Sequence, residues 1–300
     1  MNESKRWKVG IAILVLLFLG GVGIVTVLGI YSYMSKDSVV DGMLASDRIA
    51  VIRVDNIIIA SETTVDRLEK LRTDASVKAI VLRLNSPGGG VAASQEIYEA
   101  VKNCKAEGKR IVVSMGSVAA SGAYYIACAA DTIVANPGTI TGSIGVIFQF
   151  PYVKDLFDKI GVSFEVVKSG RYKDAGSAHR KITPEERRLF QGLIDDTWMQ
   201  FVEAVVQGRR MPADSVKAIA DGRIFTGRQA REIGLVDVLG TFEDAKSLAK
   251  KMCALPDDAG VREFLPRRKL LDWLSGDLDN LFGAVREKAG LSGLYYLFSE

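Results

Sequence analysis

The sequence predicts an α/β protein built around a mostly parallel sheet. Between residues 49 and 135, short apolar runs rich in β-branched residues alternate with segments of helical spacing. This alternation is typical of βαβ units, in which successive strands run parallel. Turns rich in glycine and serine follow three of the apolar runs, and open parallel sheets bind ligands at the carboxyl ends of their strands.

The first half of the predicted sheet contains two strands and two helices. Residues 49–59 are mostly Ile, Val and Ala and predict a strand. Residues 64–73 carry leucines three positions apart and predict a helix. Residues 78–84 predict a second buried strand, which ends in the Asn-Ser-Pro-Gly-Gly-Gly turn at 85–90. A helix over 91–105 is expected to follow this turn.

The second half adds two strands and two more loops of small residues. Residues 111–114 predict a third strand, and the small-residue turn at 116–123 follows it. An apolar helix begins within this turn and runs to about residue 130. Residues 132–135 predict a fourth strand, followed by Thr-Ile-Thr-Gly-Ser-Ile-Gly at 139–145. Because all three loops follow strands, we expect them at one rim of the sheet.

Beyond the fourth strand, the sequence predicts a long helix and a separate tail. Residues 164–167 are strand-like. A helix is expected over 183–207, because it opens with a threonine N-cap, a proline at the first helical position and a glutamate that completes a capping box. Residues 222–240 predict a loop, a short helix and a strand, and the chain from about residue 257 is amphipathic.

The N-terminal segment predicts a membrane anchor. Residues 9–35 contain no charged side chain and exceed the roughly 20 apolar residues that cross a bilayer. They also exceed the core of about 7–15 apolar residues of a cleaved signal peptide, which is the alternative. Basic residues precede the run, so we expect residues 1–8 in the cytoplasm and, after a linker at 36–48, the body outside it. The expected location is therefore the cell membrane, with a single pass.

Composition excludes several classes of protein. The 300 residues are 48% hydrophobic and 25% charged, which is ordinary for a globular domain. A net charge of +3 is too small to indicate nucleic acid as a partner. Three separated cysteines and a single histidine match neither a disulfide framework nor a zinc site, so no metal or cofactor is expected. Cys128 lies in an apolar stretch and is expected to be buried.

Ser121 is the candidate nucleophile. Its neighbours at 119, 120, 122 and 123 are small, so backbone or substrate can come close to it. The helix that begins there offers N–H groups and the positive end of its dipole, which can stabilise an oxyanion. The alternative is that Ser121 only caps the helix. The segment alone does not decide between the two.

A serine nucleophile needs a base, and the usual histidine is poorly placed in this chain. His179 lies in a polar loop and is interpreted as a surface residue, which argues against a Ser-His-Asp triad. A lysine can act as base when burial lowers its pKa from about 10.4. Lys173 follows the strand-like segment but, by spacing alone, is one lysine among many. Asp174 beside it is expected to have a structural role.

Four motifs together resemble the signal peptide peptidase A family, membrane-anchored Ser-Lys proteases of peptidase family S49 in the ClpP/crotonase superfamily. They are Ser-Pro-Gly-Gly-Gly at 86–90, Ala-Ser-Gly-Ala-Tyr-Tyr at 120–125, Thr-Gly-Ser-Ile-Gly at 141–145 and Ser-Gly-Arg-Tyr-Lys-Asp at 169–174. They occur in the family's order over residues 50 to about 240, and the match is to its short, single-repeat form. The resemblance implies a ClpP/crotonase-like fold of repeated ββα units over 49–255, followed by an amphipathic tail over 256–300.

The resemblance also implies a role for each site residue. Ser121 would be the nucleophile, Lys173 the general base and Ser143 the hydroxyl that orients the lysine amine. The backbone N–H groups of Gly88 and Gly122 would form the oxyanion hole. Members of the family assemble into rings in which the two members of the dyad can come from different subunits, so a ring-shaped homo-oligomer is expected here.

The expected activity is that of a membrane-anchored serine endopeptidase, which degrades cleaved signal peptides and other short apolar peptides through an acyl-enzyme. One alternative is a Ser-Lys protease of a specific membrane protein. Another is a crotonase-type acyl-CoA binder or a scaffold without proteolytic activity. The apolar tail at 294–298 is a candidate to occupy the substrate groove or contact the membrane.

Overall fold

The computed structural model describes residues 20–21, 23, 47–264 and 295–297. The chain divides into one unit over residues 1–46 and a second over residues 47–300. In the first unit, Gly20, Gly21 and Gly23 are helical, and the rest of the predicted anchor lies outside the described residues. None of the helices in the described part of the chain is both long and apolar enough to cross a membrane.

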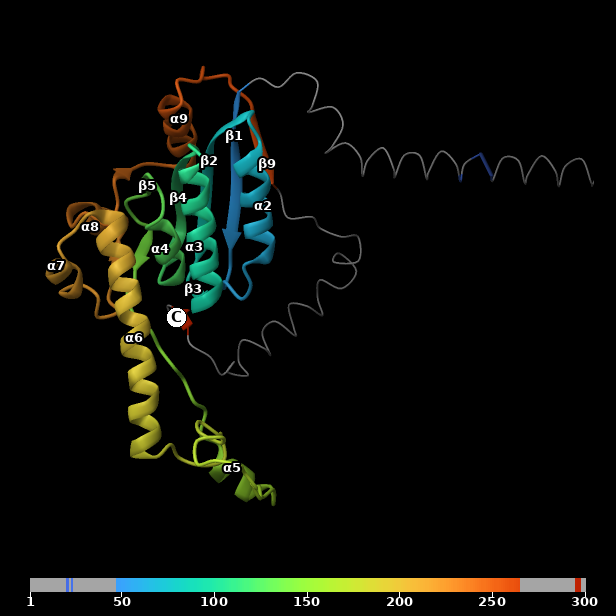
Figure 1. Ribbon diagram of the computed structural model, residues 1–300, viewed down its shortest axis with the longest axis vertical. Coiled ribbons are helices and arrows are strands. Elements are labelled where there is room, and N and C mark those ends of the chain that lie inside the picture. Colours follow the sequence, from blue (N-terminus) through green and yellow to red (C-terminus); the bar gives the residue numbers. More distant parts are fainter. Residues whose placement is uncertain (1–19, 22, 24–46, 265–294, 298–300) are drawn as a thin grey trace, which may run out of the picture. The chain divides into compact units, whose positions relative to one another are not determined.

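The second unit is built on a mixed sheet that is mostly parallel, as the sequence predicts (Figure 1). Its centre consists of three long parallel strands: β1 (Arg48–Asp55), β2 (Val77–Ser86) and β4 (Arg110–Ala120). Their apolar runs are nearly continuous because both faces of these strands are buried.

Shorter strands extend the sheet on both sides of this centre. Beyond β1 lies β9 (Val261–Phe264), which places part of the chain after residue 255 in the sheet. The first half of β4 pairs with β5 (Thr132–Ala135), and β8 (Val238–Leu239) follows β5. The second half of β4 pairs with β6 (Ile140–Gly142), and β7 (Ile224–Thr226) closes that side as an antiparallel edge.

Helices cover both faces of the sheet (Figure 1). On one face lie α2 (Glu62–Thr73), α3 (Val91–Ala106), α4 (Gly122–Ala127) and the carboxyl half of α6 (Pro184–Arg209), packed in the larger core with α7 (Ala213–Lys217) and α8 (Gly227–Glu232). The other face is covered by α9 (Phe242–Met252). Alternate residues of β1 divide between the two cores, as the period of a strand requires.

The end of β4 differs from the sequence prediction. The predicted small-residue turn over 116–123 is instead a strand as far as Ala120, and the chain turns only at Ser121. Two interactions extend the strand. The side-chain oxygen of Asn85 accepts the N–H of Ser117 at 3.0 Å, and residues 118–120 pair with β6. The strand therefore delivers its last residue directly to the candidate nucleophile.

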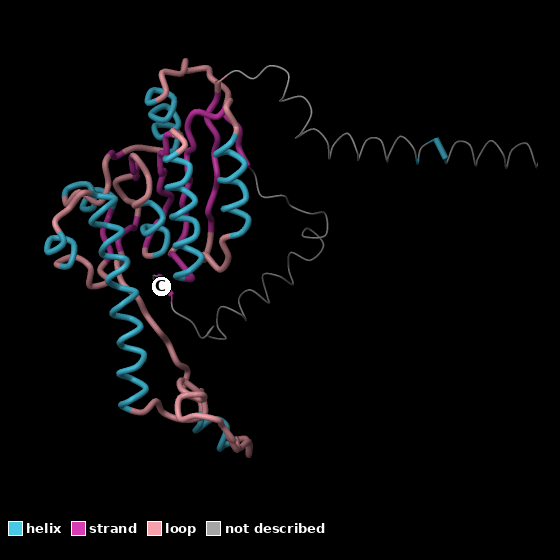
Figure 2. Tube along the Cα trace, in the orientation of Figure 1, coloured by secondary structure: helices cyan, strands magenta, loops and turns pink. Residues whose placement is uncertain are grey.

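The long helix α6 carries a separate subdomain at its amino end, which we call the arm (residues 148–183). The arm lies at the end of α6 away from the sheet and contains the short helix α5 (Lys154–Lys159) (Figures 1 and 2). Phe148 and Phe150 pack against Phe190 of α6, with ring centroids 5.1 and 4.4 Å from it. The capping box at the start of α6 is confirmed.

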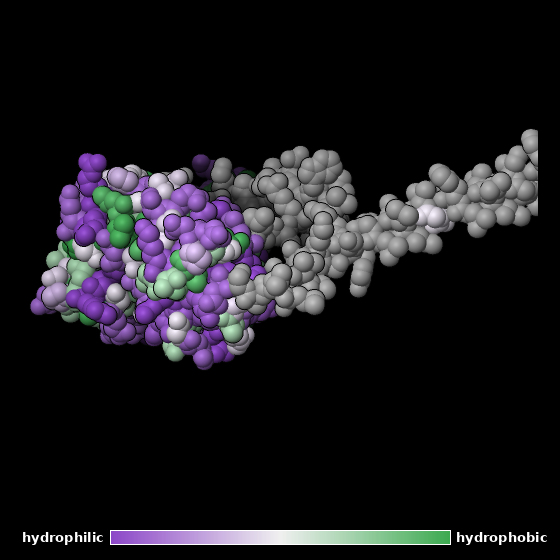
Figure 3. Space-filling view, turned by 90° about the horizontal axis from the view of Figure 1, so that it is seen from above, coloured by the Kyte–Doolittle hydropathy of each residue, from purple (hydrophilic) through white to green (hydrophobic). Residues whose placement is uncertain are grey.

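One predicted strand is absent from the arm. Residues 164–167 form no strand in the described structure, and Phe164 instead packs between the rings of Phe157 and His179. Several apolar side chains of the arm are exposed, and Val167 is 96% exposed. By contrast, the surface at the amino ends of the strands is predominantly hydrophilic, with small separate apolar patches (Figure 3).

Candidate active site

Ser121 occupies a strained turn between β4 and α4. Its backbone torsions, φ 54° and ψ −119°, match the second residue of a type II′ turn, a position usually taken by glycine. Two backbone hydrogen bonds hold this conformation: the Ser121 N–H donates to the Gly142 carbonyl at 2.8 Å, and its carbonyl accepts the Tyr125 N–H at 2.8 Å. Strain of this kind persists only where the surroundings determine the backbone, and it is common at functional sites.

The side chain of Ser121 is buried without a hydrogen bond. The residue is 1% exposed, and its Oγ is a buried polar atom with no hydrogen-bond partner within the described part of the chain. Although Ser121 stands at the N-cap position of α4, its side chain makes no capping hydrogen bond. The capping alternative is therefore wrong. A buried hydroxyl that is left unsatisfied costs free energy, so its retention calls for a reason outside folding.

Ser143 lies beside Ser121. In the β4–β6 pairing, Ala120 is opposite Gly142, so the residues that follow both strands are neighbours. Ser143 has a positive φ of 51°, and its N–H donates to the Arg223 carbonyl at 2.9 Å. A side chain at Gly142 would meet the Phe225 ring at 2.7 Å, so glycine is required before this serine. The structure thus brings two of the predicted site residues to one rim of the sheet.

The glycine-rich turn supplies a short strand, β3 (Gly88–Gly90), at the same rim. On one side, Ile58 donates to the Gly88 carbonyl at 2.8 Å and accepts the Gly90 N–H at 2.7 Å. A side chain at Gly89 would lie 2.1 Å from the Ile58 carbonyl oxygen, which excludes any other residue there. The Gly88 N–H, predicted to line the oxyanion hole, donates to Ser86 Oγ at 3.1 Å. Gly122 is buried at the first position of α4.

The other side of β3 is occupied by the tail of the same chain. Strand β10 (Tyr295–Leu297) pairs antiparallel with it, with Tyr295 opposite Gly90 and Leu297 opposite Gly88. Both β3 and β10 also contact α4, the helix that begins after Ser121. This edge therefore accepts an extended backbone beside the candidate nucleophile, a recognition mode known as strand addition.

Lys173 is not brought to this rim. It lies exposed in the arm, with its backbone N–H donating to the Gly170 carbonyl at 3.1 Å, and Ser121 Oγ has no hydrogen bond to a lysine among the described residues. His179, the other base considered, stacks on Phe164 in the same arm with ring centroids 5.0 Å apart. Within one chain, the structure places the candidate nucleophile in the core and the candidate base at the far end of α6.

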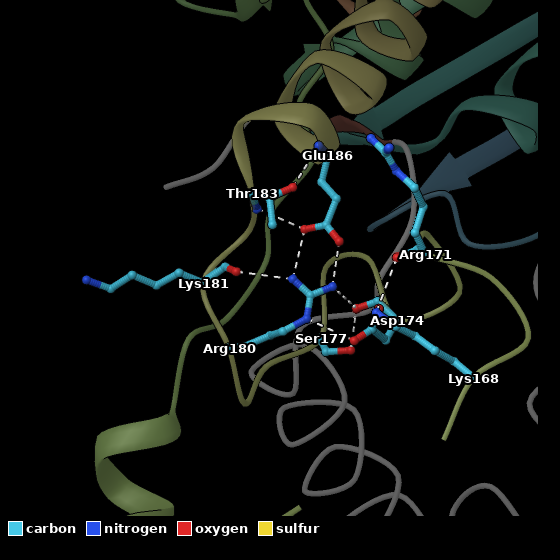
Figure 4. Close-up of polar contacts among 8 residues, drawn as sticks. All are labelled: Lys168, Arg171, Asp174, Ser177, Arg180, Lys181, Thr183 and Glu186. Atoms are coloured by element: carbon cyan, nitrogen blue, oxygen red, sulfur yellow. Dashed lines mark hydrogen bonds and ion pairs between the residues drawn. The ribbon is translucent and has the colours of Figure 1, made fainter. Parts of the chain in front are cut away.

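A network of charged side chains surrounds the loop that carries Lys173 (Figure 4). Asp174 accepts hydrogen bonds from Arg180 and Lys168, and both lower the pKa of its carboxyl. Hydrogen bonds from Arg180 also lower the pKa of Glu186 to about 2, although burial opposes this shift. These contacts are consistent with the structural role expected of Asp174, although the sequence predicts none of its partners. Arg180 was not anticipated, because side chains six residues apart do not reach each other in a regular helix or strand.

The three cysteines are free, and two of them are buried. Cys128 is buried as predicted, and burial raises the pKa of its thiol to about 12. Cys104 is also buried, and its pKa is raised to about 11 for the same reason. Across the described ranges, no three His, Cys, Asp or Glu side chains are grouped so that they would hold a metal ion.

Comparison with known proteins identifies the family. The profile of peptidase family S49 matches residues 103–255, and that of Clp protease matches residues 34–138. A protein of Synechocystis sp. named as a protease is 48% identical over 237 residues, which cover 78% of this chain and 85% of the relative. The chain belongs to peptidase family S49.

Two further relatives place the chain in the signal peptide peptidase A family. The chloroplastic serine protease SPPA of Arabidopsis thaliana is 34% identical over 82% of this chain and 39% of its own length. A protein of Enterococcus faecium named as signal peptide peptidase SppA is 41% identical over 64% of this chain and 56% of its own. This S49 member therefore spans most of the Synechocystis relative, but only about two fifths of the Arabidopsis relative and just over half of the Enterococcus relative.

We expect the Ser121→Gly variant to be more stable than Ser121→Ala. Both variants lack the hydroxyl, but glycine adopts the positive φ freely, whereas alanine retains strain on the order of 1–3 kcal/mol. Chemical denaturation of the two variants measures the difference in unfolding free energy. Ser94, inside α3, is the matched control, because alanine there should be more stable than glycine. Equal stability of the two Ser121 variants would contradict the strain.

Proposed function

We propose that this S49 protease is a serine endopeptidase with a Ser121–Lys173 dyad, which degrades cleaved signal peptides and other short apolar peptides. The observation that carries the proposal is the buried Ser121 hydroxyl, which has no partner in the described structure and sits on a strained turn. A hydroxyl held in this way is suited to attack a carbonyl once a base is supplied.

In the proposed reaction, the neutral amine of Lys173 takes the proton of Ser121 as Oγ attacks the peptide carbonyl. The N–H groups of Gly88 and Gly122 hold the resulting oxyanion, which requires the Gly88 donor to exchange Ser86 Oγ for the substrate oxygen. The leaving amine receives the proton and an acyl-enzyme remains. Water, with its proton taken by the same lysine, then attacks the ester, and the lysine returns that proton to Ser121 Oγ as the acid product leaves. Ser143 orients the lysine amine.

The base is proposed to come from a neighbouring copy of the chain. Ser121 lies at the rim of the sheet and Lys173 in the arm, at the end of α6 away from the sheet, so a second subunit is needed to bring a lysine to Ser121. The exposed apolar side chains of the arm, among them Leu156, Ile160 and Val167, are typical of a surface that packs against another protein. Packing of this kind would also bury the lysine amine, and burial is what lowers the pKa of a lysine. Repetition of the contact gives a ring-shaped homo-oligomer.

The proposed substrate binds as an extended strand on β3. Support comes from β10, which already pairs with this edge through its backbone. The preference for apolar peptides at the cell membrane follows from the family and from the proposed single-pass anchor at 9–35. A Ser-Lys protease of one specific membrane protein would use the same geometry, and substrate profiling separates the two. A crotonase-type acyl-CoA binder would not need Ser121 as a nucleophile.

The proposal is tested with a fluorophosphonate, which reacts with activated serines, on the full chain in detergent. We expect mass spectrometry to find the label on Ser121, to find none in the Lys173→Ala variant, and to find it retained in His179→Ala. An assembled protein without label at Ser121 would refute the protease mechanism. Label that survives Lys173→Ala would refute the lysine as base.

Sharing of the dyad between subunits is tested by mixing inactive chains. Ser121→Ala chains retain Lys173, and Lys173→Ala chains retain Ser121. Mixed rings of the two should therefore regain peptidase activity, because some interfaces combine an intact serine with an intact lysine. Each variant alone is the control. Mixed assemblies, verified by mass, that stay inactive would show that the dyad lies within one chain.

The tail is expected to compete with peptide substrates for β3. Deletion of residues 290–300 should lower KM for a peptide and leave kcat unchanged, because β10 no longer occupies the edge. Tyr296→Pro should have the same effect, since proline lacks the N–H needed for strand pairing, whereas Tyr296→Ala keeps the backbone donor and serves as the matched control. Unchanged kinetics after deletion would argue against competition.

A further inference from the structure

We propose that Arg180 is a positioning residue for Lys173. Its guanidinium joins the loop that carries the lysine to the first turn of α6. The inference rests on the proposed function, in which Lys173 is the base. Arg180 itself touches neither Ser121 nor any reacting atom in this proposal.

All three guanidinium nitrogens of Arg180 are used in these contacts (Figure 4). Toward the loop, Nε donates to the Asp174 carboxylate at 2.9 Å and Nη2 to the Asp174 backbone carbonyl at 3.0 Å. Toward the helix, Nη1 and Nη2 donate to the two carboxylate oxygens of Glu186 at 2.9 and 2.5 Å. The planar fork of arginine thus links two carboxylates at once, which a lysine ammonium cannot reproduce.

The loop side of this link fixes the residue next to Lys173. The Asp174 side chain is 11% exposed, and its second carboxylate oxygen accepts the ammonium of Lys168 at 2.5 Å. Its backbone carbonyl also accepts the Ser177 hydroxyl at 2.6 Å. Because both the side chain and the backbone of Asp174 are held, the Cα of the preceding lysine has little freedom to move.

The helix side of the link is anchored in turn to the core. The Glu186 side chain is 3% exposed and accepts the Thr183 N–H at 2.9 Å as part of the capping box. The same helix continues to Phe201 and Val205, which are fully buried in the larger core. Arg180 therefore connects Lys173, through one helix, to the core of its own chain, and so fixes where that chain presents the lysine to the Ser121 of its neighbour.

If Arg180 positions the base, its loss should slow the chemical step more than it weakens substrate binding. Small misplacement of a catalytic group can cost about a hundredfold in rate, whereas peptide binding on β3 involves none of these contacts. A residue that merely stabilised the arm would instead alter assembly or unfolding. The ratio of the effects on kcat and KM therefore separates the two roles.

The test compares Arg180→Gln and Arg180→Lys with Arg188→Gln in the full-length assembled protein. Arg188 is the matched control, because it pairs with Glu185 on the same helix but is 73% exposed. We expect both Arg180 variants to assemble, to lose about tenfold to a hundredfold in kcat and in the rate of fluorophosphonate reaction at Ser121, and to keep KM within about twofold. Arg188→Gln should match the unmodified protein.

Each other outcome overturns the inference. Unchanged kcat in assembled Arg180→Gln would show that the link does not position the lysine. If the conservative Arg180→Lys variant does not assemble, Arg180 is needed for the fold and not for positioning the lysine. The same conclusion holds if neither Arg180→Lys nor Arg180→Gln assembles. Lys173→Ala distinguishes failure of this inference from failure of the proposed function. If Lys173→Ala is inactive while the Arg180 variants are fully active, only the role of Arg180 is refuted. If Lys173→Ala is itself active, the proposed function is refuted.

Discussion

The hydrogen bond from the Ser121 N–H to the Gly142 carbonyl is the interaction on which the candidate site depends. It joins the ends of β4 and β6, and so places Ser143 beside Ser121. It also holds Ser121 at a positive φ, from which α4 starts immediately. The strain is offset by the surrounding core, where Tyr124 of α4 is fully buried and its hydroxyl donates to the Leu235 carbonyl at 2.9 Å. If α4 were loosely packed, the backbone of Ser121 could relax to a negative φ, and its side chain would no longer be held at the rim of the sheet.

The helix α6 is held by an arginine near each end. Near its carboxyl end, Arg209 donates to both carboxylate oxygens of Asp237, and that carboxylate also accepts the Ile133 N–H at 2.7 Å on β5. At its amino end, Glu186 accepts the fork of Arg180 from the arm. One member of each pair, Arg209 or Glu186, is buried, so removing its partner leaves that buried charge uncompensated. The helix can therefore hold the arm at a fixed distance from the core.

The central strands were predictable from the sequence, because strands buried on both faces carry nearly continuous apolar runs. The end of β4 was not, since local propensity favours a turn at Met-Gly-Ser-Val while pairing with β6 and the amide of Asn85 favour a strand. For residues 164–167 the error is the reverse, because a strand was predicted and none forms. Their composition suits a strand, but in the described structure they lie in an arm that offers no partner strand.

The candidate site divides along the same line. Ser121 could be chosen as the candidate nucleophile because the strand, the small residues and the helix around it are adjacent in sequence. The pairing of β4 with β6 places Ser143 next to it. The contacts of Arg180 depend on its own loop, the Asp174 loop and the start of α6 meeting in space, which no local pattern encodes. The separation of Lys173 from Ser121 has a chemical consequence for the proposed mechanism. When the base belongs to a neighbour, an isolated chain carries a serine without a base, so hydrolysis is confined to the assembled state.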